Sequence, residues 1–327
     1  MKNLQRVIAF IVLVFGLFGS ATAISKDRVN MVWLPSTHAL PFFVALEEGI
    51  FAEYGIEPVH SLLQNPNHII DALVSGRADV GPAASAAGIT VLAESRFPGT
   101  FRVFGLQGSN TEKDMINDRL IVVPNSGIGS FADLKGKRLA TTPGIQWRTI
   151  SRTIIRANGL DPDRDVQIVE MAIPLQAQSV ASRNVDAALT LEPAGSIADA
   201  LGNVETPLIN PTAVFIADPF YAGASLVTTR FLEQRPDVAK RVILALDRAV
   251  ELISEDFDRY RPYLVKHTAV TDETVSLVAP MYYRNSVQID EADIAAYQAF
   301  ADIFHADGVM AEKLDVSTLL LRATDID

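Results

Sequence analysis

Short apolar runs alternate with amphipathic stretches along residues 29–106. The run at residues 29–34 ends at Pro35 and is typical of a buried strand. Residues 41–54 carry apolar positions at helical spacing, with Pro41 in the first turn and Gly55 suited to the left-handed C-terminal position. The same patterns predict strands at 59–63, 79–81 and 101–106, and helices at 67–76 and 85–94. Such alternation predicts a parallel sheet covered by helices on both faces.

The middle of the chain repeats this plan. Strands are predicted at residues 120–123, 138–141, 166–171 and 186–191, with helical segments at 130–134, 146–158 and 175–183. Gly55-Ile56-Glu57-Pro58 precedes a helix and then Asp79, 24 residues after its glycine; Gly159-Leu160-Asp161-Pro162 precedes a helix and then Asp186, 27 residues after its glycine. Either two lobes share one architecture, or generic βαβ units produce the match; we expect two lobes.

The pattern changes after Pro211. A short strand is predicted at residues 225–229, a long amphipathic helix at 236–254, and two further helices at 272–283 and 290–304. Because no third βαβ set appears, we expect this tail to pack on one of the two lobes. No Gly/Ser-rich linker is present, so ordered strands should join the lobes and form the hinge.

The N-terminus has the layout of a secretory signal peptide. Lys2 and Arg6 precede an uncharged run at residues 7–19, and Ala21-Thr22-Ala23 is a small-x-small cleavage site. The run is too short for a transmembrane helix, although an uncleaved anchor is the alternative. Cleavage after Ala23 removes two of 28 basic residues, which leaves 26 against 39 acidic residues and a net charge of −13. With no cysteine for lipidation, the sequence predicts a soluble periplasmic protein.

Composition narrows the function classes. The chain of 327 residues is 49% hydrophobic and 20% charged, with a net charge of −11 and no cysteine. Its acidity argues against nucleic-acid binding, which needs a basic surface. The lack of cysteine excludes disulfide scaffolds, Fe–S clusters, cysteine-bearing zinc sites and a cysteine nucleophile.

Enzyme motifs are absent from the sequence. It holds no G-x-S-x-G, H-E-x-x-H or G-x-G-x-x-G, and the segment 129–138 fails as a P-loop because its spacing is wrong and Arg138 stands where Ser or Thr must hold Mg²⁺. The five histidines show no metal-ligand spacing. We therefore predict no catalytic residues, no metal and no cofactor.

The remaining candidates lie in loops that follow predicted strands, where open α/β sheets bind their ligands. These loops are residues 36–40, 82–85 and 143–148, and each leads into a helix N-terminus. Unpaired N–H groups there can hold an anion without a basic side chain. The predicted ligand-binding residues are Thr37, His38, Ala83, Ser85, Gly144, Gln146, Trp147, Arg148, Glu192 and Tyr221.

Each of the larger side chains has a structural alternative. His38 either binds the ligand or caps a helix, and Trp147 is either an aromatic platform or core. Arg148 either clamps a sulfonate or carboxylate, or is a solvated first-turn residue. Glu192 accepts from a ligand amine, bridges the lobes or lies at the surface; Tyr221 forms a cleft wall or packs between the lobes.

With these features assembled, the chain resembles the periplasmic substrate-binding proteins of ABC importers, in the branch for nitrate, aliphatic sulfonates, taurine and thiamine-precursor pyrimidines. The resemblance runs from about residue 28 to residue 264. It is carried by FFVALEEGIFAEYGI at residues 42–56, ALVSGRADVG at 72–81, DLKGK at 133–137 and Glu192-Pro193.

The resemblance implies a two-lobed α/β fold of the type II periplasmic binding protein class, each lobe a mostly parallel sheet, joined by two crossing strands. It implies lobe 1 from residues 26–119 and 222–327 and lobe 2 from residues 120–221. The ligand would bind between the lobes, at the loops around Thr37 and His38, Ala83 to Ser85, Gly144 to Trp147, and Glu192. Closure around it and docking on a membrane permease would follow.

Three functions are compatible with these features. The leading hypothesis is a monomeric binding protein that delivers a small solute to an ABC permease with its ATPase. The first alternative is an enzyme, either a hydrolase or a pyrimidine synthase; the synthases of this branch carry a histidine-rich motif that this sequence lacks. The second is a sensor for a membrane signalling partner. Arg148 and the helix N-termini favour a sulfonate or carboxylate, whereas Trp147 and Glu192 favour a pyrimidine-like ligand.

Overall fold

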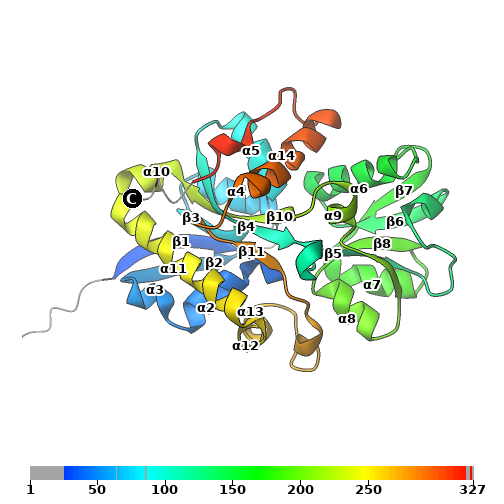
Figure 1. The fold of residues 1–327 in the computed structure, drawn as a ribbon, viewed down its shortest axis with the longest axis horizontal. Helices are drawn as coiled ribbons and strands as arrows, with labels where there is room; N and C mark the ends of the chain where they lie inside the picture. The colour runs from blue at the N-terminus through cyan, green and yellow to red at the C-terminus, as the bar shows by residue number, and fades with distance from the viewer. Residues whose placement is uncertain (1–25, 64, 85–86, 322–324, 326–327) are drawn as a thin grey trace, which may run out of the picture.

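The protein folds as two α/β lobes that lie side by side, each built on its own β-sheet (Figure 1). The computed structural model describes residues 26–63, 65–84, 87–321 and 325. The predicted signal peptide at residues 1–23 and the predicted site residue Ser85 lie outside the described residues.

Lobe 1 is built on a six-stranded sheet with the order β11-β4-β10-β3-β1-β2. β1 pairs in parallel with β2 and β3, whereas β10 runs antiparallel to β3 and β4, and β11 antiparallel to β4. The strands are β1 (Asp27–Trp33), β2 (Ile56–Leu62), β3 (Val80–Ala84), β4 (Phe101–Ser109), β10 (Phe220–Thr228) and β11 (Tyr282–Arg284).

Helices cover both faces of this sheet because its central strands are apolar on both sides. In β1, Met31 and Trp33 belong to the core beneath α2 and α11, whereas Val32 faces the core beneath α4, α5 and α14. The helices of lobe 1 are α2 (Leu40–Glu47), α3 (Ile50–Glu53), α4 (Pro66–Val74), α5 (Ala87–Arg96), α10 (Thr229–Gln234), α11 (Pro236–Glu255), α12 (Phe257–Tyr260), α13 (Tyr263–His267) and α14 (Glu291–Ala306).

Lobe 2 is built on a five-stranded sheet with the order β7-β6-β8-β5-β9. β6 is parallel to β7 and β8, and β5 is antiparallel to β8 and β9. The strands are β5 (Asp118–Val122), β6 (Lys137–Thr141), β7 (Val166–Glu170), β8 (Ala187–Leu191) and β9 (Glu205–Ile209), and the helices are α6 (Ile145–Ala157), α7 (Ile173–Ala181), α8 (Ala194–Ala200) and α9 (Pro211–Phe215).

The two sheets share one strand order. Five neighbouring strands of lobe 1 read β2-β1-β3-β10-β4, and the sheet of lobe 2 reads β7-β6-β8-β5-β9 with the same pattern of parallel and antiparallel pairs. The glycines of the two motifs, Gly55 and Gly159, precede the equivalent strands β2 and β7. The internal similarity therefore reflects a repeated architecture.

Two crossing segments, residues 110–117 and 210–219, join the lobes. They change sheet two residues earlier than the expected boundaries: Asp118 already pairs in lobe 2, and Phe220 already pairs in lobe 1. Asn210 Oδ1 accepts from the Asn117 backbone at 2.9 Å, and Thr212 Oγ1 donates to Asp118 at 2.5 Å. These bonds tie the two crossing segments to each other.

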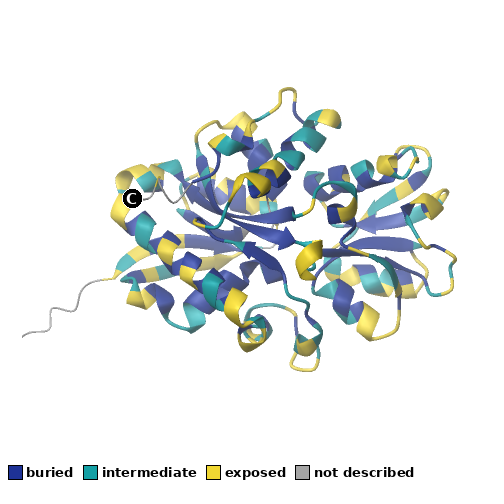
Figure 2. Cartoon of the chain, in the orientation of Figure 1, coloured by how far each residue is buried: buried dark blue, intermediate teal, exposed yellow. Residues whose placement is uncertain are grey.

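The hydrophobic core is continuous across the lobe interface. One buried cluster contains Phe300 and Phe304 of α14 together with Trp147, Ile150 and Ile154 of α6. In Figure 2 the strands of both sheets are largely buried, and exposed residues follow the outer sides of the helices.

Two expected helices differ from the structure. The helix expected at residues 41–54 is interrupted at Gly49, whose φ of +75° suits glycine, so that α2 and α3 form instead. The helix expected at 272–283 is wrong: a short 3₁₀ turn at Val275–Leu277 is followed by β11. Pro280 provides the reason, because proline disfavours a helical residue before it and lacks the N–H that a helix needs.

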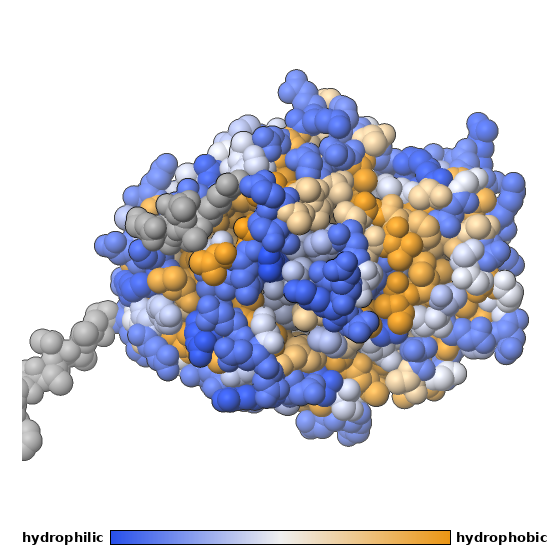
Figure 3. All heavy atoms as spheres, viewed as in Figure 1, coloured by the Kyte–Doolittle hydropathy of each residue, from blue (hydrophilic) through white to orange (hydrophobic). Residues whose placement is uncertain are grey.

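The surface seen in Figure 3 is mostly hydrophilic, with hydrophobic residues gathered over part of lobe 2. Ile209 of β9 and Val214 of α9 are among the exposed hydrophobic residues of this lobe. Within the described part of the chain, none of the helices combines the length and the hydrophobicity that crossing a bilayer requires.

Candidate functional site

The loop after β1 reaches lobe 2 through Thr37. Its hydroxyl, buried between the lobes, donates to the backbone carbonyl of Glu192 at 3.3 Å. The Thr37 carbonyl accepts from the Tyr283 hydroxyl at 2.6 Å, which fixes the loop to lobe 1. A short 3₁₀ turn at Thr37–Ala39 thus presents a polar side chain to the loop that follows β8.

The first turn of α6, which directly follows the loop after β6, reaches lobe 1 through Gln146. Its Oε1 accepts from the backbone N–H groups of Gly88 and Ile89, at 3.0 and 3.3 Å, and its Nε2 donates to the Ala222 carbonyl at 3.2 Å. Gly88 and Ile89 lie in the first turn of α5, where N–H groups have no partner within the helix. The N-terminus of α5 therefore holds an acceptor oxygen supplied by the other lobe.

A buried chain of polar side chains links the loop after β1 to the first crossing segment. His38 Nε2 lies 3.1 Å from Asn117 Oδ1, and Asn117 Nδ2 donates to Asp118 Oδ1 at 3.2 Å. Because Asn117 turns its amide nitrogen to Asp118, His38 Nε2 carries the proton of this contact. Burial lowers the pKa of His38 to about 4 against the opposing effect of its bond to Asn117, so the imidazole is neutral.

The pKa of Asp118 is shifted upward, whereas that of His38 is shifted downward. Burial raises the pKa of its carboxyl group to about 6, although the bonds from Thr212 and Asn117 act to lower it, and the nearby charge of Glu192 adds to the rise. His38 and Asp118 therefore bring two titratable groups with perturbed pKa values to the junction of the lobes.

Glu192 is fully occupied by partners within lobe 2. Arg119 Nε donates to Glu192 Oε1 at 2.5 Å, and the Ser196 backbone N–H donates to Oε2 at 3.2 Å. Arg119 also donates to the Ser196 hydroxyl at 2.8 Å. Gly195 allows this approach, because a Cβ there would stand 2.9 Å from Arg119 Cδ. The carboxylate thus serves a buried ion pair, and it is the backbone oxygen of Glu192 that meets lobe 1.

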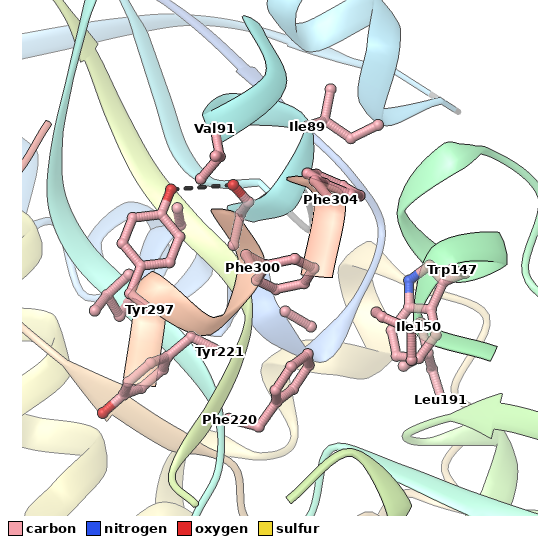
Figure 4. Close-up of a cluster of buried hydrophobic side chains, with 14 of the residues drawn as sticks. Ile89, Val91, Trp147, Ile150, Leu191, Phe220, Tyr221, Tyr297, Phe300 and Phe304 are labelled. Carbon is pink, nitrogen blue, oxygen red and sulfur yellow. Dashed lines mark hydrogen bonds between the residues drawn. The ribbon is translucent and has the colours of Figure 1, made fainter. Parts of the chain in front are cut away.

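Trp147 belongs to the core that the two lobes share. Figure 4 shows it beside Ile150 and Leu191, across from Phe300 and Phe304. Its side chain is almost completely buried. In the described structure this residue packs at the lobe interface.

Tyr221 is buried within lobe 1. Its hydroxyl donates to Asp293 near the start of α14, and its ring stacks on Tyr282 with the centroids 6.1 Å apart. Ala83, also buried, lies at the end of β3 with a φ of +65°. Neither residue makes a described hydrogen bond to lobe 2 through its side chain.

Gly144 and Arg148 form a separate group. Arg148 Nε donates to Glu170 Oε1 at 2.6 Å, and the Gly144 backbone N–H donates to Glu170 Oε2 at 3.3 Å. Arg148 is about half exposed and lies with Arg152, Asp163 and Glu170 along a surface groove of lobe 2. The structure therefore joins Thr37, His38, Gln146 and Glu192 at the lobe interface, with Trp147 packed nearby, and does not join Arg148 to them.

Several buried residues beside these contacts are not predicted from the sequence. They are Asn117, Asp118 and Arg119, a polar triplet beside an apolar strand, and Gln107 with Gly223 from the paired strands β4 and β10. Gln107 Nε2 donates to Ser225 at 2.9 Å, whereas its buried Oε1 has no hydrogen-bond partner among the described residues. A Cβ on Gly223 would stand 2.5 Å from the His38 ring, so this position requires glycine. Their signal in the sequence was the polar triplet alone.

No group of His, Asp and Glu side chains suited to a metal ion is found among the residues that the structure describes. What the site offers chemically is hydrogen bonding: backbone N–H groups at the start of α5, a neutral imidazole and buried amides. This donor set can hold acceptor oxygens and is not arranged as a nucleophile with its base.

Comparison with known proteins places the chain in a family. The family described as "NMT1/THI5 like" matches residues 36–259. The chain belongs to this NMT1/THI5-like family. A binding protein of Brucella abortus is 25% identical over 230 residues, which is 67% of this chain and 63% of that protein, so the match spans less than two thirds of that relative's length. The 4-amino-5-hydroxymethyl-2-methylpyrimidine phosphate synthase of Uromyces fabae is 33% identical over 118 residues, 35% of this chain and 32% of the synthase.

Two solved structures show the same fold. The periplasmic aliphatic sulphonate binding protein SsuA of Escherichia coli superposes with a TM-score of 0.73 at 17% identity, covering 91% of this chain and 93% of the other. The periplasmic nitrate-binding protein NrtA of Synechocystis gives a TM-score of 0.70 at 14% identity, over 92% and 87%. The NMT1/THI5-like chain therefore has the periplasmic-binding-protein fold, which confirms the expected fold class.

Proposed function

We propose that this chain is an extracytoplasmic solute-binding protein that holds a small solute between its lobes and delivers it to an ABC permease with its ATPase. The observation that carries the proposal is the contact of Gln146 with the N-terminus of α5. Polar groups from both lobes converge there, and a side-chain oxygen from one lobe already satisfies N–H groups of the other. A solute that supplies such oxygens would hold the lobes together in the same way.

The chemistry of this contact favours an oxyanion, such as a sulfonate, carboxylate or nitrate. The N–H groups of Gly88 and Ile89 are donors at the positive end of a helix dipole, and both bond to one oxygen. Glu192, for which accepting from a ligand amine was one of the alternatives, already has Arg119 and Ser196 as partners. This supports an oxyanion over an aminopyrimidine.

A ligand screen by thermal unfolding tests the proposal. Protein refolded free of carried-over solute would be mixed with nitrate, taurine, alkanesulfonates, aromatic carboxylates or aminopyrimidines. A ligand at a hundredfold excess over Kd stabilises the folded state by about 2.7 kcal/mol. That free energy corresponds to a rise of about 5 °C in Tm for a chain of this size. We expect one oxyanion class to produce the rise, and silence across all classes would contradict the proposal.

Gln146→Glu sharpens the screen. The variant places a carboxylate on the N–H groups of Gly88 and Ile89, so a bound oxyanion should be repelled and its Tm shift lost. Gln167→Glu makes the same change on the exposed side of β7 and serves as the matched control. A shift that survives in Gln146→Glu would place the ligand elsewhere.

Export and delivery need separate measurements. We propose that residues 1–23 are removed on export, because they carry the charge, hydrophobic run and cleavage pattern of a signal peptide. The mass of the protein recovered from the periplasm should lack these residues. Uptake of the identified solute should fall when the gene is deleted; unchanged uptake would favour a sensor.

The match to the Uromyces synthase supports a second candidate, an enzyme. His38 offers the site a buried, neutral imidazole, because burial lowers its pKa to about 4. Incubation of the purified protein with candidate pyrimidine precursors, followed by mass spectrometry, distinguishes the two functions. A change of substrate mass would identify an enzyme, whereas binding with no change of mass supports the binding protein.

A further inference from the structure

A further polar contact between the lobes lies outside the candidate site, where α6 of lobe 2 meets the C-terminus of α14 of lobe 1. Asp307 ends α14, and its carboxylate is 7% exposed. Arg152 Nε donates to Asp307 Oδ1 at 3.1 Å, and the Arg156 guanidinium lies 2.5 Å from the same oxygen. We call Asp307, Arg152 and Arg156 the α6–α14 clasp.

Within lobe 1, Asp307 is poorly placed. A carboxylate at a helix C-terminus faces the negative end of the helix dipole, where cations are favoured. Among the described residues, the ion pairs of Asp307 are with Arg152 and Arg156, both in lobe 2. The electrostatic stabilisation of this carboxylate therefore depends on contact between the lobes.

The orientation of Arg152 is fixed by a second partner within lobe 2. Arg152 directs both terminal nitrogens of its guanidinium at Asp163, with distances of 2.6 and 2.9 Å. This paired geometry fixes the planar group and leaves Nε for Asp307. The bonds to Asp163 and Asp307 raise the pKa of Arg152, with the Asp163 bond as the largest cause.

The clasp also borders the apolar contact of the same two helices. Phe300 and Phe304 of α14 and Ile150 and Ile154 of α6 belong to one buried cluster. If the lobes separated at this edge, Asp307 would lose Arg152 and Arg156 as partners. Its carboxylate would then face the negative end of the α14 dipole without a neighbouring cation. The charges and the apolar side chains thus act on the same movement.

We propose that Asp307, Arg152 and Arg156 position the two lobes and set the balance between their closed and open arrangements. The proposal rests on the two-lobed fold. If the proposed function is right, a shift toward the open arrangement should also weaken solute binding, and only this consequence rests on the proposed function. Loss of a hydrogen bond to a charged group such as the Asp307 carboxylate should change the ratio of open to closed molecules by about tenfold.

The experiment measures the distance between the lobes in ligand-free protein. The chain has no cysteine, so spin labels can be placed on Leu201→Cys in α8's C-terminal turn and Leu244→Cys in α11, two exposed positions in different lobes. We expect a population at the closed distance in the parent protein. In Asp307→Asn the ratio of open to closed molecules should rise about tenfold. High salt should produce part of this change in the parent and little in the variant.

Asp302→Asn is the matched control. Asp302 lies on α14 five residues earlier, and its ion-pair partner is Lys313 of the same lobe. The same loss of charge there should leave the distance distribution unchanged. Arg156→Gln should reproduce the effect of Asp307→Asn in part, and adding it to Asp307→Asn should bring little further change.

Three outcomes would overturn the proposal: identical distributions in the parent and Asp307→Asn, an equal shift in Asp302→Asn, or a parent that populates only the open distance. Circular dichroism confirms that each variant is folded before its distances are compared. Because no ligand enters this experiment, failure of the clasp and failure of the solute-binding proposal are read from different measurements.

Discussion

The two lobes use equivalent loops to contact each other, but they use different chemistry. Thr37, in the connection after β1, contacts the loop after β8, and Gln146, in the first turn of the helix after β6, contacts the helix after β3. Since β1 and β3 of lobe 1 correspond to β6 and β8 of lobe 2, the two contacts are related by the pseudo-symmetry of the sheets. Thr37 donates to a backbone carbonyl, whereas Gln146 accepts from backbone N–H groups.

The difference extends to the strands beneath these loops. Asp118 of β5 stands opposite Leu191, the last residue of β8, and Ala224 of β10 stands opposite Ala84, the last residue of β3. The residues that follow, Arg119 in lobe 2 and Ser225 in lobe 1, hold corresponding places in the two sheets, although the register of β10 with β3 shifts after Ala224. Arg119 carries a buried ion pair, and Ser225 a neutral bond from Gln107. At this strand position the repeated backbone thus carries a charged side chain in lobe 2 and a neutral one in lobe 1.

Breaking the charged member of this pair should have the largest effect. Arg119→Ala leaves the buried Glu192 carboxylate without its cation, which should lower the free energy of unfolding by about 3–5 kcal/mol. The equivalent Ser225→Ala in lobe 1 loses a neutral hydrogen bond, so its loss should be about 1 kcal/mol. Urea unfolding of both variants measures the difference. Equal losses would mean that the ion pair is not what distinguishes the lobes.

The pH dependence of stability should separate the two lobes next. His38 of lobe 1 has a pKa lowered to about 4, so as the pH falls the unfolded chain takes up a proton at this residue before the folded protein does. The free energy of unfolding therefore decreases as the pH falls from about 6.5 to 4. Asp118 of lobe 2 has a pKa raised to about 6, so the folded state binds the extra proton, and stability is lost as the pH rises from about 4 to 6.

Two variants isolate these opposing slopes. The gain in stability between pH 4.5 and pH 7 should be smaller than in the parent by about 2 kcal/mol in His38→Gln, and larger by about 2 kcal/mol in Asp118→Asn. Burial also raises the pKa of Asp247 to about 6. This residue is unchanged in both variants, so its contribution to the pH dependence is the same in the variants and the parent. Profiles parallel to that of the parent protein would show that neither group titrates as its burial implies.

The sequence alone predicted the repeated α/β plan because that plan is local. Buried parallel strands such as 29–34 appear as apolar runs, and helices such as α6 have clear amphipathic spacing. β11 could not be predicted in this way, since its three residues pair with β4, far away in the sequence. Three residues, two tyrosines and an arginine, are too few for a periodicity that separates a short strand from a helix.

The candidate site was predicted at the level of loops, but not always at the level of side chains. Gln146, Ile150 and Ile154 follow each other at a spacing of four on the buried side of α6, whereas Arg148, Arg152 and Arg156 form a second row. This helical spacing is enough to place Gln146 and Arg148 on different faces of the helix. The ion pair of Glu192 with Arg119 could not be foreseen, because the two residues are 73 positions apart and only the sheet brings them together.

The Gln146 contact should influence closure more than stability. Gln146→Ala leaves the N–H groups of Gly88 and Ile89 without their acceptor only when the lobes are closed, because water reaches them in the open form. The closed arrangement should lose about 1.5 kcal/mol, close to a tenfold fall in its population. The inter-lobe spin-label distance measures this directly. The exposed Gln167→Ala is the control, and an unchanged distance in Gln146→Ala would remove this contact from the closure mechanism.

Loss of the Thr37 hydroxyl, which makes the equivalent contact from lobe 1, should have a smaller effect than the changes predicted above at Arg119, at His38 and Asp118, and at Gln146. Its bond to the Glu192 carbonyl is 3.3 Å long and neutral, and that carbonyl keeps a second lone pair for water or other donors. Thr37→Val keeps the shape and removes only the hydroxyl, so closure should weaken by about 0.5–1 kcal/mol, or two- to fivefold in the closed population. Thr37→Ser should restore it, because the hydroxyl returns. If Thr37→Val opened the lobes as far as Gln146→Ala, the two contacts would be energetically equivalent, and the asymmetry between the lobes would lie only in the strands beneath them.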